Sequence, residues 1–495
     1  MATVGLQVSE ERARLLVQRV VGFKGGGRPL STADASLARA AFDDLLTIAG
    51  LDTSDIEIVA QDLALDTRIR ATEAAVAAIG AGGYIASRFI GDGTVRVSTR
   101  HVEASLESYA HVRFEDPSRA PGPRVAAAQR AMIAGFQRAG DGRWMYIHPG
   151  FPHNTDSLLE LLGYPRDEDE ARRAIAGWEA SRLEQEIMRR GLCSAMLREP
   201  DEWDGSPMGR ILNSRPVVEI IQVGDADPRP AAASARPLAD YKVLDLTRVL
   251  AGPTCARTLA SYGAQVIRIG AQDLPHVPLF VAETGLGKRS AHIDLKTDTG
   301  RAKLRELIGE ADVFSQGYRT GALERQGFGV AEVVRAKPGI VYVSINCYGH
   351  EGPWRSVPGW EQLAQTVTGM AYLHGKSHND GRPQLQPAAV TDYTTGYLAA
   401  YGALAALLRQ REQGGSYWVR VSLARTGVWM RSLGLREAVT HRPFDGKEIT
   451  ELRAIAETEW GSMHHLRPAV ELSNTDVFWQ QPPVSLGSDA PAFGG

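Results

Sequence analysis

The chain contains 495 residues, of which 43% are hydrophobic and 23% are charged. This composition is ordinary for a folded protein of two or three domains. The formal net charge of −3 at pH 7 gives no long-range attraction to nucleic acid or to an anionic membrane surface. We therefore expect neither partner, and any bound anion must be held by a local cluster of basic residues.

The cysteines and the N-terminus bear on the compartment. Cys193, Cys255 and Cys347 are far apart and show no paired metal spacing, which favours a reduced compartment without disulfides or a metal site. The first residues lack the basic start and apolar core of a secretion signal. The longest apolar stretch, 397–408, is well short of the roughly 20 residues that span a bilayer. These features predict a cytoplasmic protein.

Before residue 223 the pattern predicts helices mixed with short strands. An Ala-rich helix is expected at 74–86 and a strand at 95–98, and a compact α+β unit follows, with an aromatic strand within 141–148 and helices at 156–162 and 167–190. The segment 223–238 is rich in Pro, Ala and Asp and has little periodicity, so it is the best candidate for a linker.

From Tyr241 onward, short β-branched runs alternate with helical ones. Strands are expected at 242–246, 265–269, 312–314 and 339–345, and helices at 254–260, 299–308 and 323–335. Such alternation is typical of βαβ units. It predicts an α/β fold with a parallel, doubly wound, Rossmann-like sheet.

A weak internal repeat links the two halves. The helix 74–86 precedes the strand Val95-Arg-Val-Ser98, and the helix 397–408 precedes Val419-Arg-Val-Ser422. Counting back equally from each strand places Arg68 where the second copy has Asp392, with Asp66 close by. Chance similarity between two Ala-rich helices is the alternative, because Ala is the best helix former.

Asp392 is the most informative residue of the chain. It lies in Pro387-Ala-Ala-Val-Thr-Asp-Tyr-Thr-Thr-Gly396, directly before the apolar helix. A carboxylate at a helix start tends to stay ionised, and Gly396 permits close approach of another group. Asp392 is therefore a candidate nucleophile or base, and its alternative role is a helix N-cap.

Anion and metal motifs give weaker signals. The first βα connection, Thr247-Arg-Val-Leu-Ala-Gly-Pro253, lacks G-x-G-x-x-G, and no Walker loop or H-E-x-x-H motif occurs in the chain. Basic residues that stand at later turns and are candidates for holding phosphates are Lys288, Arg289, Arg319 and Arg325. His148 and His153 suit a metal or acid/base pair, but two intervening prolines and the lack of further ligands favour a structural loop.

In this order, the motifs resemble the class III CoA-transferase family, which includes formyl-CoA and carnitine CoA-transferases and the α-methylacyl-CoA racemases. The motifs that carry the resemblance are Val243-Leu-Asp-Leu-Thr-Arg-Val-Leu-Ala-Gly-Pro253, Gly263-Ala-Gln-Val-Ile-Arg268, Gly287-Lys-Arg-Ser290, Asp294-Leu-Lys296, Ala311-Asp-Val-Phe314, Tyr318-Arg-Thr-Gly321, Gly349-His-Glu-Gly-Pro353 and Asp392-Tyr-Thr-Thr-Gly396. They cover 239–422 well and the tail 468–486 loosely.

The resemblance implies a covalent mechanism in which Asp392 attacks an acyl-CoA thioester and becomes an aspartyl-CoA thioester. It implies acyl-CoA and a small carboxylic acid as substrates, with the CoA thioester as co-substrate and no permanently bound cofactor. Backbone N–H groups near the helix start are expected to stabilise the oxyanions. The residues that it implies for CoA contact are Arg248, Val249, Leu250, Ala251, Arg268, Lys288, Tyr318 and Arg325.

The family's order of segments is rearranged in this chain. The expected domains are a partial repeat of second-half material at 1–100, a small α+β domain at 101–222, the linker at 223–238 and the Rossmann-like CoA-binding catalytic domain at 239–495. The resemblance also implies an interlocked homodimer. Gly317 and Gly270 replace an Asn and an acidic residue common in the family, and no Gly-rich shielding loop is visible before Asp141, which leaves hydrolysis as an alternative to transfer.

Further alternatives are a lyase, a racemase and a non-catalytic CoA-binding protein. Trp360 occupies the place of the racemase histidine and cannot shuttle a proton, although His350 is near in sequence. An intact Asp392 motif argues against a non-catalytic role.

Overall fold

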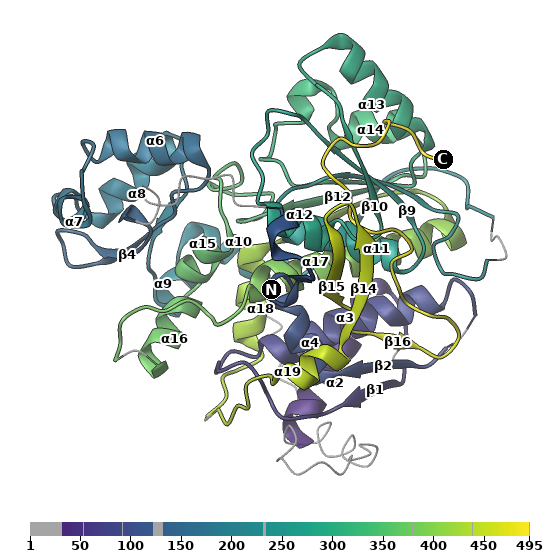
Figure 1. The fold of residues 1–495 in the computed structure, drawn as a ribbon, viewed down its shortest axis with the longest axis horizontal. Helices are drawn as coiled ribbons and strands as arrows, with labels where there is room; N and C mark the ends of the chain where they lie inside the picture. The colour runs from purple at the N-terminus through teal and green to yellow at the C-terminus, as the bar shows by residue number, and fades with distance from the viewer. Residues whose placement is uncertain are drawn as a thin grey trace, which may run out of the picture.

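The computed structural model describes residues 32–494 apart from 53, 92, 122–131, 231–233, 379 and 438. Its centre is a seven-stranded sheet with the order β10-β9-β8-β11-β12-β13-β7 (Figure 1). The strands are β7 (Glu219–Gly224), β8 (Lys242–Leu246), β9 (Gln265–Gly270), β10 (Lys288–His292), β11 (Val313–Gln316), β12 (Val341–Asn346) and β13 (Ser416–Ser422). All neighbouring pairs are parallel except β13 and β7, which are antiparallel. The predicted parallel α/β sheet is confirmed.

Helices cover both faces of this sheet. Successive strand residues alternate between two cores: Val243, Val313 and Val341 face one core, and their neighbours Leu244, Phe314 and Tyr342 face the other. The first core also contains side chains of α11 (Ala251–Ser261) and α17 (Val390–Gln413), and the second contains those of α13 (Asp298–Glu310) and α14 (Val330–Ala336). Because every central strand is apolar on both faces, the sheet is buried between helices, as expected for a doubly wound fold.

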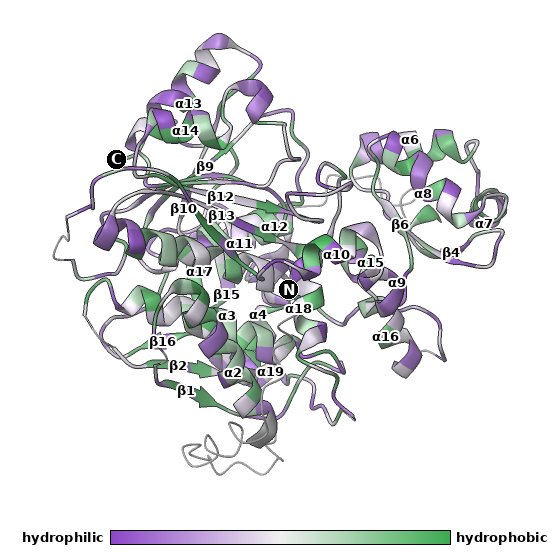
Figure 2. Ribbon diagram, turned by 180° about the vertical axis from the view of Figure 1, so that it is seen from behind, coloured by the Kyte–Doolittle hydropathy of each residue, from purple (hydrophilic) through white to green (hydrophobic). Residues whose placement is uncertain are grey.

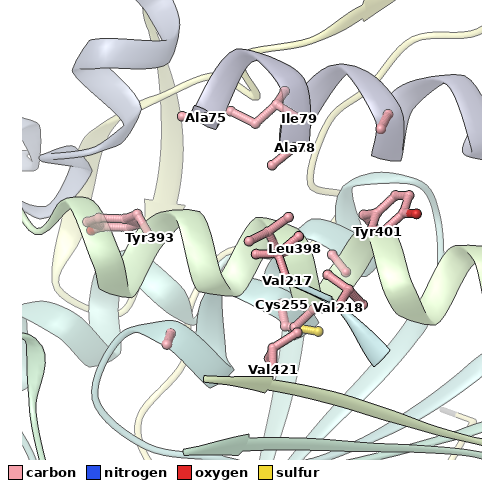
Figure 3. Close-up of a cluster of buried hydrophobic side chains, with 14 of the residues drawn as sticks. Ala75, Ala78, Ile79, Val217, Val218, Cys255, Tyr393, Leu398, Tyr401 and Val421 are labelled. Atoms are coloured by element: carbon pink, nitrogen blue, oxygen red, sulfur yellow. The ribbon is translucent and has the colours of Figure 1, made fainter. Parts of the chain in front are cut away.

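The N-terminal repeat packs against its second copy. Its elements are α2 (Thr32–Ala49), β1 (Ile56–Val59), α3 (Ala71–Ser87), β2 (Val95–Ser98) and α4 (Thr99–Ser105), and β1 pairs with β2 in parallel. The order β1-α3-β2-α4 matches β12-α17-β13 followed by α18 (Leu423–Ser432), except that α15 (Glu361–Val367) and α16 (Met370–His378) are inserted between β12 and α17. Figure 3 shows α3 and α17 side by side, with Ala75, Ala78 and Ile79 above Leu398. Small side chains on α3 let the two helices approach closely.

Aligning α3 and α17 by their first residues gives a different correspondence from counting back from the strands β2 and β13. Glu73 is the third residue of α3 and Asp392 is the third residue of α17, each directly after a Thr. The prediction that Arg68 stands at the place of Asp392 is therefore wrong, because seven residues separate α3 from β2 whereas two separate α17 from β13. The first copy does contain a carboxylate. Glu73 is fully buried and its two oxygens pair with Arg70 at 2.8 Å and Arg436 at 2.6 Å.

A separate small unit carries its own core. The three-stranded antiparallel sheet β4 (Gly135–Arg138), β5 (Trp144–Ile147) and β6 (Ser194–Met196) packs on α6 (Pro152–Leu161), α7 (Glu168–Ala176) and α8 (Ala180–Arg189). Figure 1 shows this unit extending from one side of the main body. The helix expected at 167–190 is two helices, since the chain turns at 177–179. The residues that share this core lie within 132–196, a shorter range than the predicted 101–222.

Remaining elements complete the main body. They are β3 (Arg113–Phe114), α9 (Pro200–Asp204), α10 (Pro207–Asn213), α12 (Pro278–Thr284), α15 (Glu361–Val367), α16 (Met370–His378), α19 (Gly446–Glu451), β14 (Arg453–Thr458), β15 (Gly461–Leu466) and β16 (Glu471–Leu472), with 3-10 turns at Ser108–His111, Pro117–Arg119 and Glu324–Gln326. β16 joins the sheet of β1 and β2, and β15 pairs with both β14 and β3. In Figure 2 the strands β1 and β2 are hydrophobic, whereas α13 carries hydrophilic residues. Within the described residues, no helix is long and apolar enough to cross a membrane.

Candidate active site

Asp392 lies on a cavity between the small unit and the central sheet. The cavity has a volume of about 270 Å³. Its lining comes from the turn after β8, the turn after β11, the loop before α15 and the start of α6, and it includes Phe151, His153, Cys193, Arg248, Val249, Leu250, Ala251, Tyr318, Arg319, Cys347, Arg355, Trp360 and Asp392. The turns after β8 and β11 lie at the carboxyl ends of neighbouring parallel strands, which is where open α/β sheets bind ligands.

The start of α17 is capped by a second carboxylate, not by Asp392. Glu361 accepts hydrogen bonds from Thr391 N at 3.0 Å, from Thr391 Oγ1 at 2.6 Å and from Asp392 N at 2.5 Å. Gln365 holds the same carboxylate with Nε2 at 2.5 Å. Asp392 is two residues beyond the first helical residue, and no described residue donates a hydrogen bond to its carboxylate. The N-cap role is therefore excluded, and the side chain of Asp392 stays available to a ligand.

The pair of carboxylates has an unusual electrostatic state. Asp392 is 7% exposed and Glu361 is 5% exposed. Burial raises the pKa of Asp392 well above its usual range, and the nearby charge of Glu361 raises it further. Burial also raises the pKa of Glu361, although four hydrogen bonds oppose that shift. The expectation that the helix start keeps Asp392 ionised is wrong, because the N–H groups that would favour its charge are bonded to Glu361.

Close packing of α17 on α11 fixes the place of Asp392. A Cβ on Gly396 would lie 2.5 Å from Ala251 O and 2.6 Å from Thr254 Cβ, so any larger residue would push the helices apart. Gly396 is one helical turn after Asp392. The close approach predicted from Gly396 is confirmed, and it brings Asp392 next to the N-terminus of α11.

The turn after β8 is strained and positively charged. Val249 has φ 72°, a left-handed value that a β-branched residue rarely adopts. Arg248 donates a hydrogen bond to Pro275 O, and its guanidinium lies 5.2 Å from the Phe151 ring centroid. Burial lowers the pKa of Arg248. Arg248 thus reaches the cavity from the central sheet, and Phe151 reaches it from the small unit.

The residues expected to contact CoA fall into two groups. Arg248, Val249, Leu250, Ala251 and Tyr318 line the cavity with Asp392. Arg268 lines a smaller adjoining cavity of about 10 Å³ together with Arg248 and Phe151. No described residue accepts a hydrogen bond from the Arg268 guanidinium or forms an ion pair with it, and burial lowers its pKa. These six residues are brought together by the fold.

Lys288 and Arg325 are placed elsewhere. Lys288 is 2% exposed and its Nζ lies 2.7 Å from Asp245 Oδ2 and 2.8 Å from Pro253 O. Arg325 is exposed on the turn Glu324–Gln326 and does not line the cavity. Their expected contact with CoA remains a prediction that these positions do not support. Instead, Lys288 ties the start of α11 to β8, because its Nζ bonds both Pro253 O of α11 and Asp245 of β8. Asp245 also accepts from Thr247 N at 3.0 Å, which fixes the turn after β8.

Two other basic candidates have protein partners. Arg289 donates to Ala492 O at 3.1 Å and to Gly494 O at 3.0 Å, so it fixes the C-terminal segment. Arg319 lines the cavity and donates to Gly191 O at 2.9 Å. The predicted cluster of these residues with Lys288 and Arg325 does not form.

Histidines play no visible metal role. His148 Nδ1 accepts from Gly150 N at 3.1 Å within the stiff loop, and His153 lies exposed on the cavity wall. His350 is outside the cavity, and burial lowers its pKa to about 3. In the described part of the chain, no group of three or more His, Cys, Asp or Glu side chains is placed to hold a metal ion.

Sequence reasoning missed Glu361 and the small-unit residues of the cavity. Glu361 stands 31 positions before Asp392, and only the path of the chain through α15 and α16 brings it to the start of α17. The only local signal for Glu361 was its position in the first turn of a helix. This signal was weak, because acidic residues are common in the first turn of helices that have no catalytic role.

Residues 238–456 match the model of CoA-transferase family III. Acetyl-coenzyme A transferase nodX of Hypoxylon pulicicidum is 30% identical over 396 residues, which are 71% of this chain and 66% of that protein. An acyl-CoA transferase of Gibberella moniliformis is 33% identical over 311 residues, 58% of this chain and 54% of that one. The succinyl-CoA:glutarate CoA-transferase of Mus musculus is 35% identical over 200 residues, covering 38% and 45%.

A solved structure of a hypothetical protein (Rv3272) from Mycobacterium tuberculosis is 29% identical, with a TM-score of 0.37 over 40% of this chain and 58% of that one. The chain spans between about half and two thirds of the length of the first two curated relatives. The family match covers strands β8 to β13 of the central sheet, the turn after β8 and Asp392, whereas β7 lies before it. The protein belongs to CoA-transferase family III.

Proposed function

We propose that this protein transfers CoA from an acyl-CoA to a carboxylic acid, with Asp392 as the covalent nucleophile. The observation that carries the proposal is the state of Asp392: its backbone N–H donates to Glu361, and its side chain lies on the cavity without a hydrogen-bond donor among the described residues. Similarity to an acetyl-coenzyme A transferase and to a succinyl-CoA:glutarate CoA-transferase supports it.

Each half of the reaction exchanges one bond for another. The Asp392 carboxylate attacks the thioester carbonyl, which forms a mixed anhydride and releases CoA thiolate. The thiolate then attacks the aspartyl carbonyl, which forms aspartyl-CoA thioester and releases the donor acid. The acceptor carboxylate attacks this thioester and regenerates the thiolate and a new anhydride, from which the thiolate removes the acceptor acyl group. Asp392 is restored as a carboxylate.

Oxyanion stabilisation is assigned to α11 in this scheme. The N–H groups of Thr391 and Asp392 are bonded to Glu361, so the first turn of α17 does not supply them. Ala251 and Gly252 line the cavity at the N-terminus of α11, where backbone N–H groups have no partner within the helix. Such groups stabilise negative charge that develops on a carbonyl oxygen.

CoA itself is assigned to the turn after β8. Arg248, with Arg268 in the adjoining cavity, supplies positive charge for the phosphates. Val249, Leu250 and Ala251 form the path toward Asp392. An interlocked homodimer and a cytoplasmic location are part of the same proposal and rest on the family resemblance.

Racemisation is disfavoured by the residue at the place of the racemase histidine. Trp360 lies on the cavity and has no titratable proton near neutral pH, and His350 lines a different pocket. Hydrolysis uses the same aspartyl-CoA intermediate with water as acceptor, so it is measured in the same assay.

The test combines exchange with trapping. Asp392→Ala should abolish exchange of CoA between an acyl-CoA and a labelled free acid, while binding of CoA measured by calorimetry persists. Hydroxylamine added to the wild type with acyl-CoA should convert Asp392 to a hydroxamate, detected by peptide mass spectrometry. Full exchange by Asp392→Ala would overturn the covalent mechanism, and release of free acid without exchange would show a hydrolase.

A further inference from the structure

One aromatic side chain forms part of the wall that faces Asp392. Trp360 directly precedes Glu361, which bonds the backbone of Asp392, and both Trp360 and Asp392 line the cavity. Its position along the chain is therefore fixed by the same contacts that fix the nucleophile. A group attached to Asp392 therefore shares this cavity with the Trp360 side chain.

The indole is held from three sides by the small unit. The His148 ring stacks on it with centroids 4.9 Å apart and planes 16° apart. Phe151 meets it edge to face at 5.4 Å, and the indole Nε1 donates to Cys193 Sγ at 3.2 Å. A Trp with its ring stacked and its N–H bonded has few rotamers left. The wall is rigid.

The chemistry of this wall is apolar. Burial raises the pKa of Cys193 to about 11 and that of Cys347 well above its usual range, so both are neutral thiols at physiological pH. Cys347 Sγ lies 3.8 Å from Trp360 O. Trp360, Phe151 and these thiols together offer hydrocarbon, sulfur and aromatic faces to a bound group.

Space in the cavity is limited. Its volume of about 270 Å³ is below the roughly 300–1,000 Å³ of pockets that enclose drug-sized ligands, and the end of the CoA arm must share it with the acyl group. Resting on the proposed function, we infer that Trp360 determines specificity by ending the acyl subsite. It limits the reaction to short, apolar acyl groups.

The test is a chain-length profile. Exchange rates are measured with acetyl-, butyryl-, hexanoyl- and octanoyl-CoA and one labelled acceptor acid for wild type, Trp360→Ala and Trp360→Phe. One methylene in an apolar pocket changes kcat/KM by about 10- to 200-fold. Trp360→Ala should therefore raise the octanoyl to butyryl ratio of kcat/KM by at least about tenfold, and Trp360→Phe should raise it less.

Two further variants keep the outcome decisive. His148→Ala leaves Trp360 in place but removes its stack, and should broaden the profile in the same direction even if Trp360→Ala fails to fold. Trp460→Ala changes an indole that does not line the cavity and should leave the profile as in the wild type. Unchanged profiles in folded Trp360 and His148 variants, with exchange that still depends on Asp392, would overturn the inference. Absence of exchange from the wild type with every donor would instead overturn the proposed function.

Discussion

At the scale of single residues, Asp392 combines a raised pKa with a proposed role that needs its ionised form. Burial stabilises the neutral acid, and Glu361 opposes a second negative charge. The carboxylate that forms in this site is poorly solvated, which favours attack on a carbonyl once CoA and its cationic contacts are in place. The buried charge lowers the free energy of unfolding of the protein.

That cost gives a pH-dependent prediction. A carboxyl group with a raised pKa in the folded state stabilises the protein fully below its unfolded pKa, and this contribution is lost as the pH rises through the folded pKa. Asp392→Asn should therefore raise the melting temperature relative to wild type at neutral pH, with a difference that shrinks toward pH 4. Thermal melts between pH 4 and 8 measure it. Asp156→Asn, at an exposed position, should show no such trend, and a difference for Asp392→Asn that is independent of pH would contradict the assignment.

The charge of Glu361 should be visible in the kinetics. Because that charge raises the pKa of Asp392, Glu361→Gln should shift the acid limb of the kcat/KM profile to lower pH while it lowers the maximal rate through poorer placement of α17. Exposed Glu332→Gln on α14 is the control and should leave the profile unchanged. A Glu361→Gln profile with an unshifted acid limb would show that the two carboxylates do not interact.

At the scale of elements, the turn after β8 and the start of α11 form the most constrained part of the site. Lys288 on β10 bonds both Asp245 of β8 and the backbone of α11 in a buried pair. Removing one partner of such a pair leaves an uncompensated buried charge. Lys288 therefore acts on the turn that carries Arg248 as a positioning residue.

Loss of Lys288 should destabilise the fold. Lys288→Met should lower the free energy of unfolding by about 3–5 kcal/mol, measured by urea denaturation. Lys296 is a matched control because it pairs with Asp273 at 2.6 Å with exposed fractions of 74% and 61%, and Lys296→Met should cost about 0–1 kcal/mol. Similar losses for the two variants would contradict a buried role for Lys288.

Substitution of the left-handed residue in this turn should have the opposite effect on stability. Val249 holds φ 72° at a cost of about 1–3 kcal/mol, so Val249→Gly should keep or raise the melting temperature while it weakens CoA binding through a looser turn. Val343→Gly, in the buried centre of β12, should lower the melting temperature strongly. Loss of stability in Val249→Gly equal to that in Val343→Gly would show that the strain is absent.

At the scale of the whole molecule, the chain contains two units that share a β-α-β-α order, and of their two aligned carboxylates only that of Asp392 has no ion-pair partner among the described residues. Glu73 occupies the helix position that Asp392 occupies, but Arg70 and Arg436 bind both of its oxygens. Arg436 lies beyond α18, so this ion pair joins the N-terminal unit to the second half of the chain. The first copy has become a structural contact between the units.

This arrangement predicts one covalent adduct per chain. Intact-mass analysis after acyl-CoA and hydroxylamine should show a single modification, mapped to Asp392, and none on Glu73. Arg436→Met should lower stability because it leaves Glu73 buried with one partner, yet the adduct should still map to Asp392 alone. Labelling of Glu73 in the wild type would show that the first copy is also reactive.

The sequence by itself determined the parallel sheet and singled out Asp392 as the candidate nucleophile. Strands such as Val341–Asn346 are apolar on both faces, and that local pattern is sufficient to predict a sheet covered by helices. The resemblance of the motifs within 243–396 to the family pointed to Asp392, because Asp392 lies within one short continuous motif, Asp392-Tyr-Thr-Thr-Gly396.

Only the tertiary structure decided which groups surround Asp392. Glu361 bonds its backbone, Trp360 and Cys193 line its cavity, and His148 stacks on Trp360. These contacts join segments far apart in the sequence, and no local periodicity encodes them. The burial of Lys288 and the alignment of Glu73 with Asp392 likewise depend on how helices and strands pack. Packing sets the solvation and the partners of a charge, and these decide whether a carboxylate or an ammonium acts on a ligand or only holds the fold together.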